Sequence, residues 1–343
     1  SFVCHLKKVL ALVLAFACAF TMFAGAAFTD QADIKVDSDV VDTLVSLGVI
    51  EGFEDGSFQP NGTVTRAQMA KMIYVLRTGN SDASAYNDDK TSFTDIGTHW
   101  ARGYIKYCQS LNIIAGKSNT KFCPNDKVTA QEAAKMLLVT LGYDAQKAGL
   151  VGAGWASKTN ALADENGLLE NVNTSFTAAC PRQYAAQLIY NAIDAPTVVW
   201  RDDAYTTNNY GNGDNPTIGE KYMGLKKTVG TLETFAKTSG KDTYEMTISN
   251  VNNTESTDGK DAVKAFTKVK KDYTSYKYNT VKVLYKAKDD VYGVFATSDN
   301  TSNTGVLADL KLDGVAADRK VKLDGTKYDL AASGKTAVYV NGT

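Results

Sequence analysis

The feature that most constrains this chain is a segment that occurs three times. The first copy, residues 52–68, reads as a glycine-rich turn, a phenylalanine, a proline and then the start of a helix. Residues 122–132 repeat this order, and residues 176–184 keep a degraded form of it. Each copy leads into apolar residues at helical spacing. One such unit cannot bury its own apolar face, so we expect three copies that close around a shared core.

The capping residues mark where the second helix of each repeat begins. Thr65 can accept an N–H at the helix terminus, and Gln68 can reach back to it, which makes a capping box. Thr129 and Glu132 have the same spacing in the second copy. In the third copy Pro181 replaces the threonine, and we expect it at the first helical position, where a missing N–H costs little.

Further landmarks recur with these helix starts and set the repeat boundaries. In the first repeat a first helix is expected to begin near Asp37 or Ser38 and to end at Gly48. The pair Trp100-Ala101 begins the corresponding helix of the second repeat, and Trp155-Ala156 that of the third. We therefore place the repeats at 28–77, 92–142 and 154–194.

Residues 1–27 have the pattern of a secretory signal peptide. Lys7 and Lys8 precede an apolar run, 9–23, that is shorter than a membrane span, and small residues at 24–27 offer a cleavage site before Phe28. A lipoprotein anchored through Cys18 is disfavoured, because apolar sequence continues past that cysteine. The chain begins with Ser1 and ends in a strand-like pattern, so we expect a fragment of a longer protein.

From about residue 196 the composition changes. Residues 196–222 are expected to form a turn-rich linker, and residues 223–343 a β-rich domain that ends or is cut at 343. Strands are predicted at 244–248, 280–285, 291–295 and 337–340, with a hairpin turn at Asp289-Asp290. The predicted fold class is multidomain, an all-α pseudo-threefold repeat bundle followed by the β-rich domain.

Composition and single residues exclude several functional classes. A net charge of -1 over 343 residues argues against a nucleic-acid binder. Two histidines are present, and His5 lies in the leader, so a multi-histidine metal site is excluded. No Ser-His-Asp set, phosphate loop or paired-carboxylate site is recognisable. We therefore predict that the chain is not an enzyme and has no catalytic residues, no metal site and no cofactor.

Three cysteines follow the leader: Cys108, Cys123 and Cys180. An odd count does not make a disulfide framework. A bridge between Cys123 and Cys180 is one interpretation, since both precede equivalent helices, but small buried thiols are favoured.

The repeats resemble the S-layer homology family. Its repeat has Phe-x-Asp, then Trp-Ala at a helix start, an apolar pair followed by glycine, Phe-x-Pro, and a Thr-Arg-Ala-Glu-like helix start. The second repeat matches through Phe93-x-Asp95, Trp100-Ala101, Ile113-Ile114-x-Gly116 and Phe122-x-Pro124. The first matches through Phe28-x-Asp30, Gly48-Val49-Ile50-x-Gly52, Phe58-x-Pro60 and Thr65-Arg66-Ala67-Gln68. The resemblance covers residues 28–194, about half the chain.

The resemblance implies grooves between repeats that bind secondary cell-wall polysaccharide non-covalently, often through pyruvylated amino sugars. In the family the helix-start arginine and the opening aspartate line the grooves, with tryptophan and glycine near the sugar. The residues carried over are Arg66, Arg182, Asp30, Asp95, Trp100, Trp155, Gly52 and Gly116. An arginine at a helix N-terminus suits a ketal carboxylate, because its fork of donors adds to the helix dipole.

Departures from the family pattern reduce the number of expected sites. Ala130 stands where the second repeat would have its arginine, the first repeat has no tryptophan, and the third has no Phe-x-Asp. We therefore expect one or two competent grooves.

Each candidate also has a structural interpretation. Arg66 and Arg182 could be solvated helix-start charges, and the tryptophans could be core anchors. Asp95 could cap the next turn. Lys71 and Lys135, each five residues past the arginine position, could add to the positive field, but solvated side chains are favoured.

The resulting functional hypothesis is a secreted protein of the cell wall or S-layer. The repeats would anchor it to wall polysaccharide, and the β region would serve as structural S-layer or spacer material, with self-association in a surface layer. Two alternatives stay open. One is an anchored enzyme whose catalytic domain lies downstream or in the β region, and the other is an adhesin.

Overall fold

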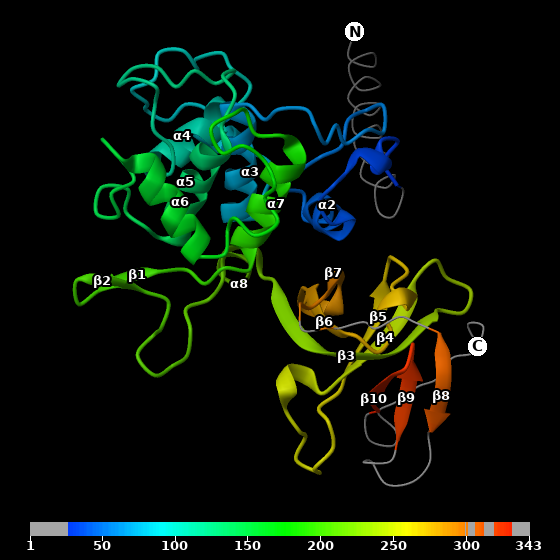
Figure 1. Cartoon of the computed structure of the whole chain (residues 1–343). Helices are drawn as coiled ribbons and strands as arrows, with labels where there is room; N and C mark the ends of the chain where they lie inside the picture. Colours follow the sequence, from blue (N-terminus) through cyan, green and yellow to red (C-terminus); the bar gives the residue numbers. More distant parts are fainter. Residues whose placement is uncertain (1–26, 299, 301–305, 312–318, 331–343) are drawn as a thin grey trace. The chain divides into compact units, whose positions relative to one another are not determined.

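The computed structural model describes residues 27–298, 300, 306–311 and 319–330. Nearly all of the expected leader and the strand expected at 337–340 lie outside the described residues. The described residues belong to two compact units (Figure 1). The first contains residues up to 227 together with 283–294, and the second contains 228–282 and the described residues from 295 onward.

Three pairs of helices build the first unit, one pair for each repeat. They are α2 (Ser38–Ser46) with α3 (Arg66–Thr78), α4 (Arg102–Ser110) with α5 (Ala130–Leu141), and α6 (Trp155–Glu165) with α7 (Arg182–Ile193). Two short 3-10 turns, η1 (Gln31–Asp33) and η2 (Ser84–Tyr86), precede α2 and α4. The helical region predicted for 28–194 is confirmed.

Two of the helix caps lie where the sequence predicts them. Thr65 Oγ1 accepts the Gln68 N–H (3.1 Å), and Gln68 Oε1 accepts the Thr65 N–H (2.9 Å). Thr129 and Glu132 form the same capping box before α5. These reciprocal bonds satisfy two of the N–H groups that a helix N-terminus leaves without partners.

Two predicted helix starts are wrong by one or two residues. Pro181 is the N-cap of α7, one position before the first helical residue, and has extended backbone angles (φ -66°, ψ 146°). A proline fits there because its fixed φ is compatible with an extended cap. Trp100 stands two residues before α4, whereas Trp155 is the first residue of α6.

Three extended segments join the repeats at the centre of the bundle. Val64, Val128 and Cys180 lie just before the three second helices, and all three are buried. The Val64 N–H donates to the Cys180 carbonyl (3.0 Å), Cys180 to Val128 (2.8 Å), and Val128 back to Val64 (3.0 Å). These backbone bonds form a closed ring with one member from each repeat, and the ring gives the bundle its pseudo-threefold character.

The helix N-termini extend this cyclic pattern. The Arg66 N–H donates to the Asp126 carbonyl in the second repeat (2.9 Å), and the Gln131 N–H donates to Phe176 in the third (3.1 Å). The Arg182 N–H closes the cycle by donating to Gly62 in the first repeat (2.8 Å). The first N–H groups of a helix have no partner inside it, so here each repeat completes the helix of another.

The turns at the two Phe-x-Pro segments are each held by one aspartate. The Asp30 carboxylate accepts the N–H groups of Phe58 and Gln59 (both 2.8 Å). Asp95 likewise accepts those of Phe122 (3.0 Å) and Cys123 (2.8 Å). Gln59 and Cys123 have positive φ (54° and 58°), which is uncommon for residues other than glycine. Asp95 therefore holds a turn, as one interpretation of the sequence expected. The turn lies 27 residues further along the chain and is not the next turn in the sequence.

Residues 196–222 contain more regular structure than their turn-rich composition suggests. β1 (Val199–Arg201) and β2 (Ala204–Thr206) form an antiparallel hairpin. Helix α8 (Ile218–Met223) follows, with a capping box made by Thr217 and Glu220. The Val198 N–H donates to the Leu141 carbonyl at the end of α5 (2.9 Å), which ties this segment to the second repeat.

The remaining strands form two antiparallel arrangements. One has five strands in the order β5-β4-β3-β6-β7, and the other has three in the order β10-β9-β8. The first comprises β3 (Lys226–Lys237), β4 (Tyr244–Ser249), β5 (Lys264–Val269), β6 (Thr280–Tyr285) and β7 (Val291–Ala296). The second comprises β8 (Leu307–Lys311), β9 (Lys320–Leu323) and β10 (Thr326–Asp329).

The predicted β-rich region is thus confirmed. Three predicted strands correspond to β4, β6 and β7, and residues 286–290 join the last two at the predicted turn. Three 3-10 turns lie between strands: η3 (Val251–Asn253), η4 (Thr274–Tyr276) and η5 (Ala287–Asp289).

The pH dependence of stability tests the role of Asp95. Burial raises the pKa of Asp95, but hydrogen bonds from the Phe122 and Cys123 amides outweigh it and hold the pKa below its ordinary value. Such a group stabilises the fold above its unfolded pKa of about 3.9, and this contribution is lost as pH falls from there through the folded pKa. Asp95→Asn should therefore lower the free energy of unfolding at pH 7 and flatten its pH dependence below about pH 4.

Urea unfolding between pH 2 and 7 measures this effect. Asp88→Asn is the control, because Asp88 is exposed. An Asp95→Asn variant with the same stability and pH dependence as the Asp88→Asn variant would contradict the assigned role.

Candidate functional site

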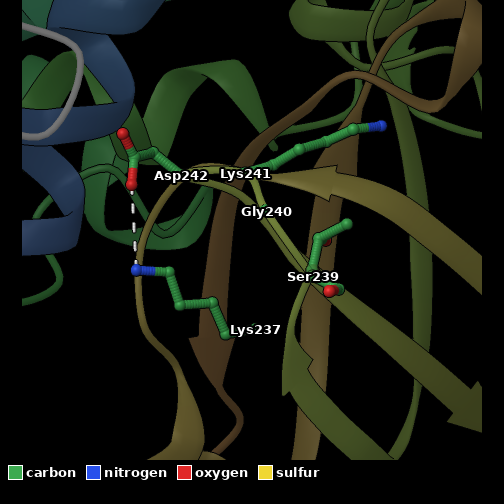
Figure 2. A pocket seen from close by; sticks show the side chains of 6 residues that line it. Lys237, Ser239, Gly240, Lys241 and Asp242 are labelled. Atoms are coloured by element: carbon green, nitrogen blue, oxygen red, sulfur yellow. Dashed lines mark ion pairs between the residues drawn. The ribbon is translucent and has the colours of Figure 1, made fainter.

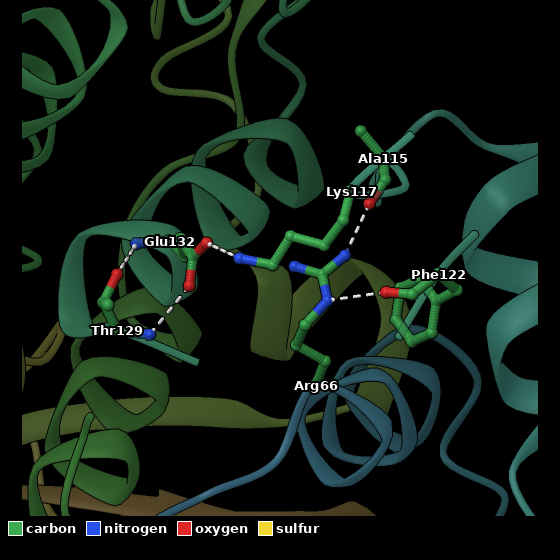
Figure 3. Close-up of polar contacts among 6 residues, drawn as sticks. All are labelled: Arg66, Ala115, Lys117, Phe122, Thr129 and Glu132. Carbon is green, nitrogen blue, oxygen red and sulfur yellow. Dashed lines mark hydrogen bonds and ion pairs between the residues drawn. The ribbon is translucent and has the colours of Figure 1, made fainter. Parts of the chain in front are cut away.

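Arg66, the first residue of α3, is buried rather than solvated. Its side chain is 4% exposed and reaches across to the second repeat. Nε donates to the Phe122 carbonyl (3.0 Å) and Nη2 to the Ala115 carbonyl (2.6 Å), as Figure 3 shows. The guanidinium also lies over the Phe122 ring, 4.5 Å from its centroid. The interpretation of Arg66 as a solvated charge is wrong.

Arg182 makes the equivalent contacts from the third repeat to the first. It is 8% exposed, with Nε donating to the Phe58 carbonyl (3.0 Å) and Nη2 to the Glu51 carbonyl (2.9 Å). Its guanidinium lies 4.8 Å and 5.1 Å from the ring centroids of Phe53 and Phe58. The solvated-charge interpretation is wrong here too, and the two arginines are related by the pseudo-threefold arrangement.

Both guanidinium groups keep unused donors. A guanidinium carries five N–H groups, and the described part of the chain offers Nη1 of Arg66 and of Arg182 no hydrogen-bond partner. Burial lowers the pKa of both arginines, and nearby carboxylates such as Glu132 and Asp30 partly offset this. Arginine nevertheless remains charged in proteins, so each group presents fixed cationic donors to a ligand.

Further residues lie around Arg66, most of them charged or aromatic. We call this set the Arg66 cluster, and it consists of Arg66, Ala115, Gly116, Lys117, Phe122, Glu132, Lys135 and Trp155. Lys117 Nζ pairs with Glu132 Oε1 (2.9 Å), while Glu132 Oε2 accepts the Thr129 N–H (2.9 Å; Figure 3). Lys135 Nζ lies over the Trp155 ring, 5.4 Å from its centroid. Three repeats contribute to this cluster.

The corresponding Arg182 cluster contains Arg182, Glu51, Gly52, Phe53, Phe58 and Lys71. Lys71 Nζ pairs with Glu51 Oε2 (3.2 Å). Gly52 directly follows Glu51, whose carbonyl holds Arg182. Trp100 is 54% exposed and packs on Tyr104 (centroids 6.1 Å apart), which lies within electrostatic range of Glu51.

A third such cluster is incomplete. Ala130 takes the helix-start position in the second repeat, so no guanidinium reaches the third. Gln187 takes the position of Lys71 and Lys135, and its amide donates to Asn191 (2.9 Å). Five of the predicted site residues therefore come together in two clusters: Arg66, Gly116 and Trp155 in one, and Arg182 and Gly52 in the other. Asp30, Asp95 and Trp100 belong to neither cluster.

Several predicted site residues also have structural roles. The exposure of Trp100 contradicts its interpretation as a core anchor, whereas Trp155 is half-buried beneath Lys135. Asp30 and Asp95 hold backbone turns. At Gly116 an added Cβ would lie 2.2 Å from the Ser118 carbonyl oxygen and 2.6 Å from that of Lys121, so only glycine fits.

Sequence reasoning did not identify several members of these clusters. It assigned no role to Glu51 or Lys117, and it weighed a positive field from Lys71 and Lys135 but favoured solvated side chains. The signal for the lysines was their shared spacing from the helix start. Nothing in the sequence alone reveals which lysine has a carboxylate partner.

The cysteines are free thiols. The described residues contain Cys108 and Cys180, which are buried, and the half-buried Cys123, so the bridge between Cys123 and Cys180 is wrong. Burial raises the pKa of the Cys108 and Cys180 thiols to about 12. Both remain protonated and unreactive at neutral pH, as expected of small buried groups.

Other features carry less functional information. Figure 2 shows a pocket lined by residues 237–242, at the end of β3 and in the loop that leads to β4. An exposed ion pair there joins Lys237 Nζ and Asp242 Oδ1, 3.7 Å apart. In the described ranges no three His, Cys, Asp or Glu side chains are grouped so that they could hold a metal ion. The helices of this part of the chain are all too short or too polar to cross a membrane.

Comparison with known proteins agrees with the repeat architecture. The family model of the S-layer homology domain matches residues 27–70 and 92–134. The chain carries S-layer homology domains. The third repeat lies outside the two matched segments, but the hydrogen-bond ring through Cys180 joins it to them as the third member of the same helical bundle.

Among the individual relatives, two are named as surface proteins and one as an enzyme. A cell surface protein of Thermoanaerobacter kivui is 29% identical over 58% of this chain and 26% of its own length. A surface layer protein of Brevibacillus choshinensis is 27% identical over 95% of this chain and 30% of its own. Exoglucanase XynX of Acetivibrio thermocellus is 27% identical over 47% of this chain and 16% of its own. The chain spans less than a third of each of these relatives.

Gly116→Ala tests whether the glycine is required by packing. The new Cβ would meet two backbone oxygens, so the free energy of unfolding should fall by about 3 kcal/mol. Gly97→Ala is the control, because a Cβ there has no atom within 4 Å. Equal thermal unfolding midpoints for the two variants would rule out the steric role.

Arg66→Lys tests whether the arginine joins two repeats. Lysine keeps the charge but lacks the planar fork, so the Phe122 and Ala115 carbonyls lose their shared donor. We expect a loss of about 2–3 kcal/mol in urea unfolding. Arg102→Lys is the control, since Arg102 also begins a helix but is partly exposed. An unchanged stability in the Arg66 variant would show that its carbonyl contacts do not hold the repeats together.

Proposed function

We propose that the S-layer homology repeats anchor a secreted surface protein non-covalently to bacterial secondary cell-wall polysaccharide. The β region then serves as structural S-layer or spacer material, and copies of the protein associate in a surface layer. The observation that carries the proposal is a guanidinium that two backbone carbonyls hold in a cluster with a lysine, found twice in one bundle; in the Arg66 cluster the lysine also lies over a tryptophan ring.

The chemistry of the clusters suits a sugar polymer. Each guanidinium is held by two backbone carbonyls, so its remaining donors are oriented before a ligand arrives, and little entropy is lost on binding. An aromatic ring offers an apolar face for the C–H groups of a pyranose, as the exposed ring of Trp100 does. Guanidinium and ammonium groups also attract the carboxylates of acidic sugars.

The names of two relatives support a role at the cell surface rather than an enzymatic activity. Two of those named above are called cell surface or surface layer proteins, and we propose that this chain, like them, serves at the cell surface and is not an enzyme. The exoglucanase among the relatives favours one alternative, in which similar repeats anchor a catalytic domain. The adhesin alternative draws no support from a specific contact.

Cosedimentation with purified cell walls tests the anchoring. The whole chain should pellet with walls and should stay in solution after hydrofluoric acid has stripped their polysaccharide. Persistent pelleting with stripped walls would mean that the ligand is peptidoglycan and that the proposal is wrong.

Trp100→Ala should weaken this binding without unfolding the bundle. Because Trp100 is exposed, its removal should cost about 1 kcal/mol of binding free energy and leave the unfolding midpoint unchanged. Trp200→Ala is the matched control, since Trp200 is 42% exposed in the β1–β2 hairpin, outside both clusters. Equal affinities for the two variants would remove Trp100 from the binding site.

A further inference from the structure

The two clusters differ in the electrostatic state of one lysine. Lys71 and Lys135 occupy equivalent positions, five residues past their helix starts. Lys71 is neutralised by Glu51, whose carboxylate lies 3.2 Å away. The residue equivalent to Glu51 in the second repeat is Ala115, which carries no charge. A single acidic side chain thus separates the two sites.

Lys135 has no such counter-ion. In the described part of the chain no carboxylate lies within ion-pairing distance of its ammonium group, which lies over Trp155 instead. Glu132 acts on the charge of Lys135, but both of its oxygens are engaged, one by Lys117 and the other by the Thr129 N–H. The ammonium group therefore keeps its hydrogen-bond donors free.

The neighbourhood of Lys135 favours an added negative charge. Burial lowers the pKa of Lys135; Glu132 opposes this shift, and the positive charge of Arg66 adds to it. Two cations, Arg66 and Lys135, thus share one partly buried region, and both keep unused donors. An anion placed between them would relieve their repulsion and satisfy those donors.

We propose that the two clusters bind different sugars of the wall polysaccharide. The Arg66 cluster takes an acidic sugar, whose carboxylate is held by Arg66 and Lys135 beside Trp155. The Arg182 cluster takes a neutral sugar, because Glu51 already occupies Lys71 and repels a carboxylate. This division of labour rests on the proposed function.

Binding at two unlike sites has a consequence for selectivity. One polysaccharide that carries both sugars at a suitable spacing engages both clusters, and the second contact forms at a high effective concentration. A polymer that carries only one kind of sugar engages one cluster and binds more weakly. Discrimination between walls then follows from the combination of sugars rather than from either sugar alone.

The test compares two forms of one ligand. Wall polysaccharide from the source organism is used intact and after carbodiimide–borohydride reduction, which converts each carboxylate into a hydroxymethyl group. Titration calorimetry with the whole chain should give about tenfold tighter binding to the intact form. Lys135→Gln should lose this preference and bind both forms equally, whereas Lys71→Gln should retain it.

The reciprocal variant makes the test sharper. Glu51→Gln frees Lys71 and should create a second acidic-sugar site, so the ratio of the affinity for the intact polysaccharide to that for the reduced form should rise above the ratio of the wild-type chain. The Glu51 side chain is 56% exposed and its carbonyl bond to Arg182 is untouched, so the fold should be unaffected. Lys135→Arg retains the charge and should keep the preference, which separates charge from packing against Trp155.

The outcomes distinguish this inference from the proposed function. Absence of binding to both polysaccharide forms would overturn the anchoring itself. Two other outcomes would overturn the division between the clusters and leave the anchoring intact, provided that the wild-type chain binds. One is an equal loss of the preference for the intact polysaccharide in the Lys135→Gln and Lys71→Gln variants. The other is no gain in that preference in the Glu51→Gln variant.

Discussion

The ring of backbone hydrogen bonds among Val64, Val128 and Cys180 is the interaction on which the first unit depends. Each bond joins a different pair of repeats, so the loss of any one repeat would leave two polar groups buried without partners. The ring also sets where each second helix begins, because each helix starts two residues after its ring residue. The repeats therefore complete one another within one helical bundle, and each helix-start side chain lies at a fixed place on a neighbouring repeat.

The arginines show how closely the fold and the candidate site are coupled. Arg66 and Arg182 use part of their donors to hold a neighbouring repeat and keep the rest for a ligand. A guanidinium can serve both purposes because its five N–H groups point in several directions in one plane. The same coupling explains why arginine substitution alone is a poor probe of binding. Lysines, tryptophans and Glu51, which lie at the margins of the clusters, separate ligand contacts from stability.

Local chemistry explains which parts of this structure could be predicted from the sequence. The capping boxes at Thr65 and Thr129 involve residues three apart, and the apolar helix faces follow a short period, so both are visible in the sequence. The partners of Arg66 are 49 and 56 residues away, and those of Arg182 are 124 and 131 away. Such contacts depend on how the ring closes, which no local pattern encodes. For the same reason the sequence does not show the difference between Lys71 and Lys135, because that difference depends on which residues, Glu51 or Trp155, lie beside them in the fold.

The central claim is that sugar binds at the Arg66 and Arg182 clusters and not at the corresponding place beside Ala130. A crystal structure of the chain with an oligosaccharide released from the cell wall tests this most directly. The account predicts sugar density against Arg66 with Lys135 and Trp155, and against Arg182, with none beside Ala130 and Gln187. Density beside Ala130, or sugar bound only outside both clusters, would contradict it.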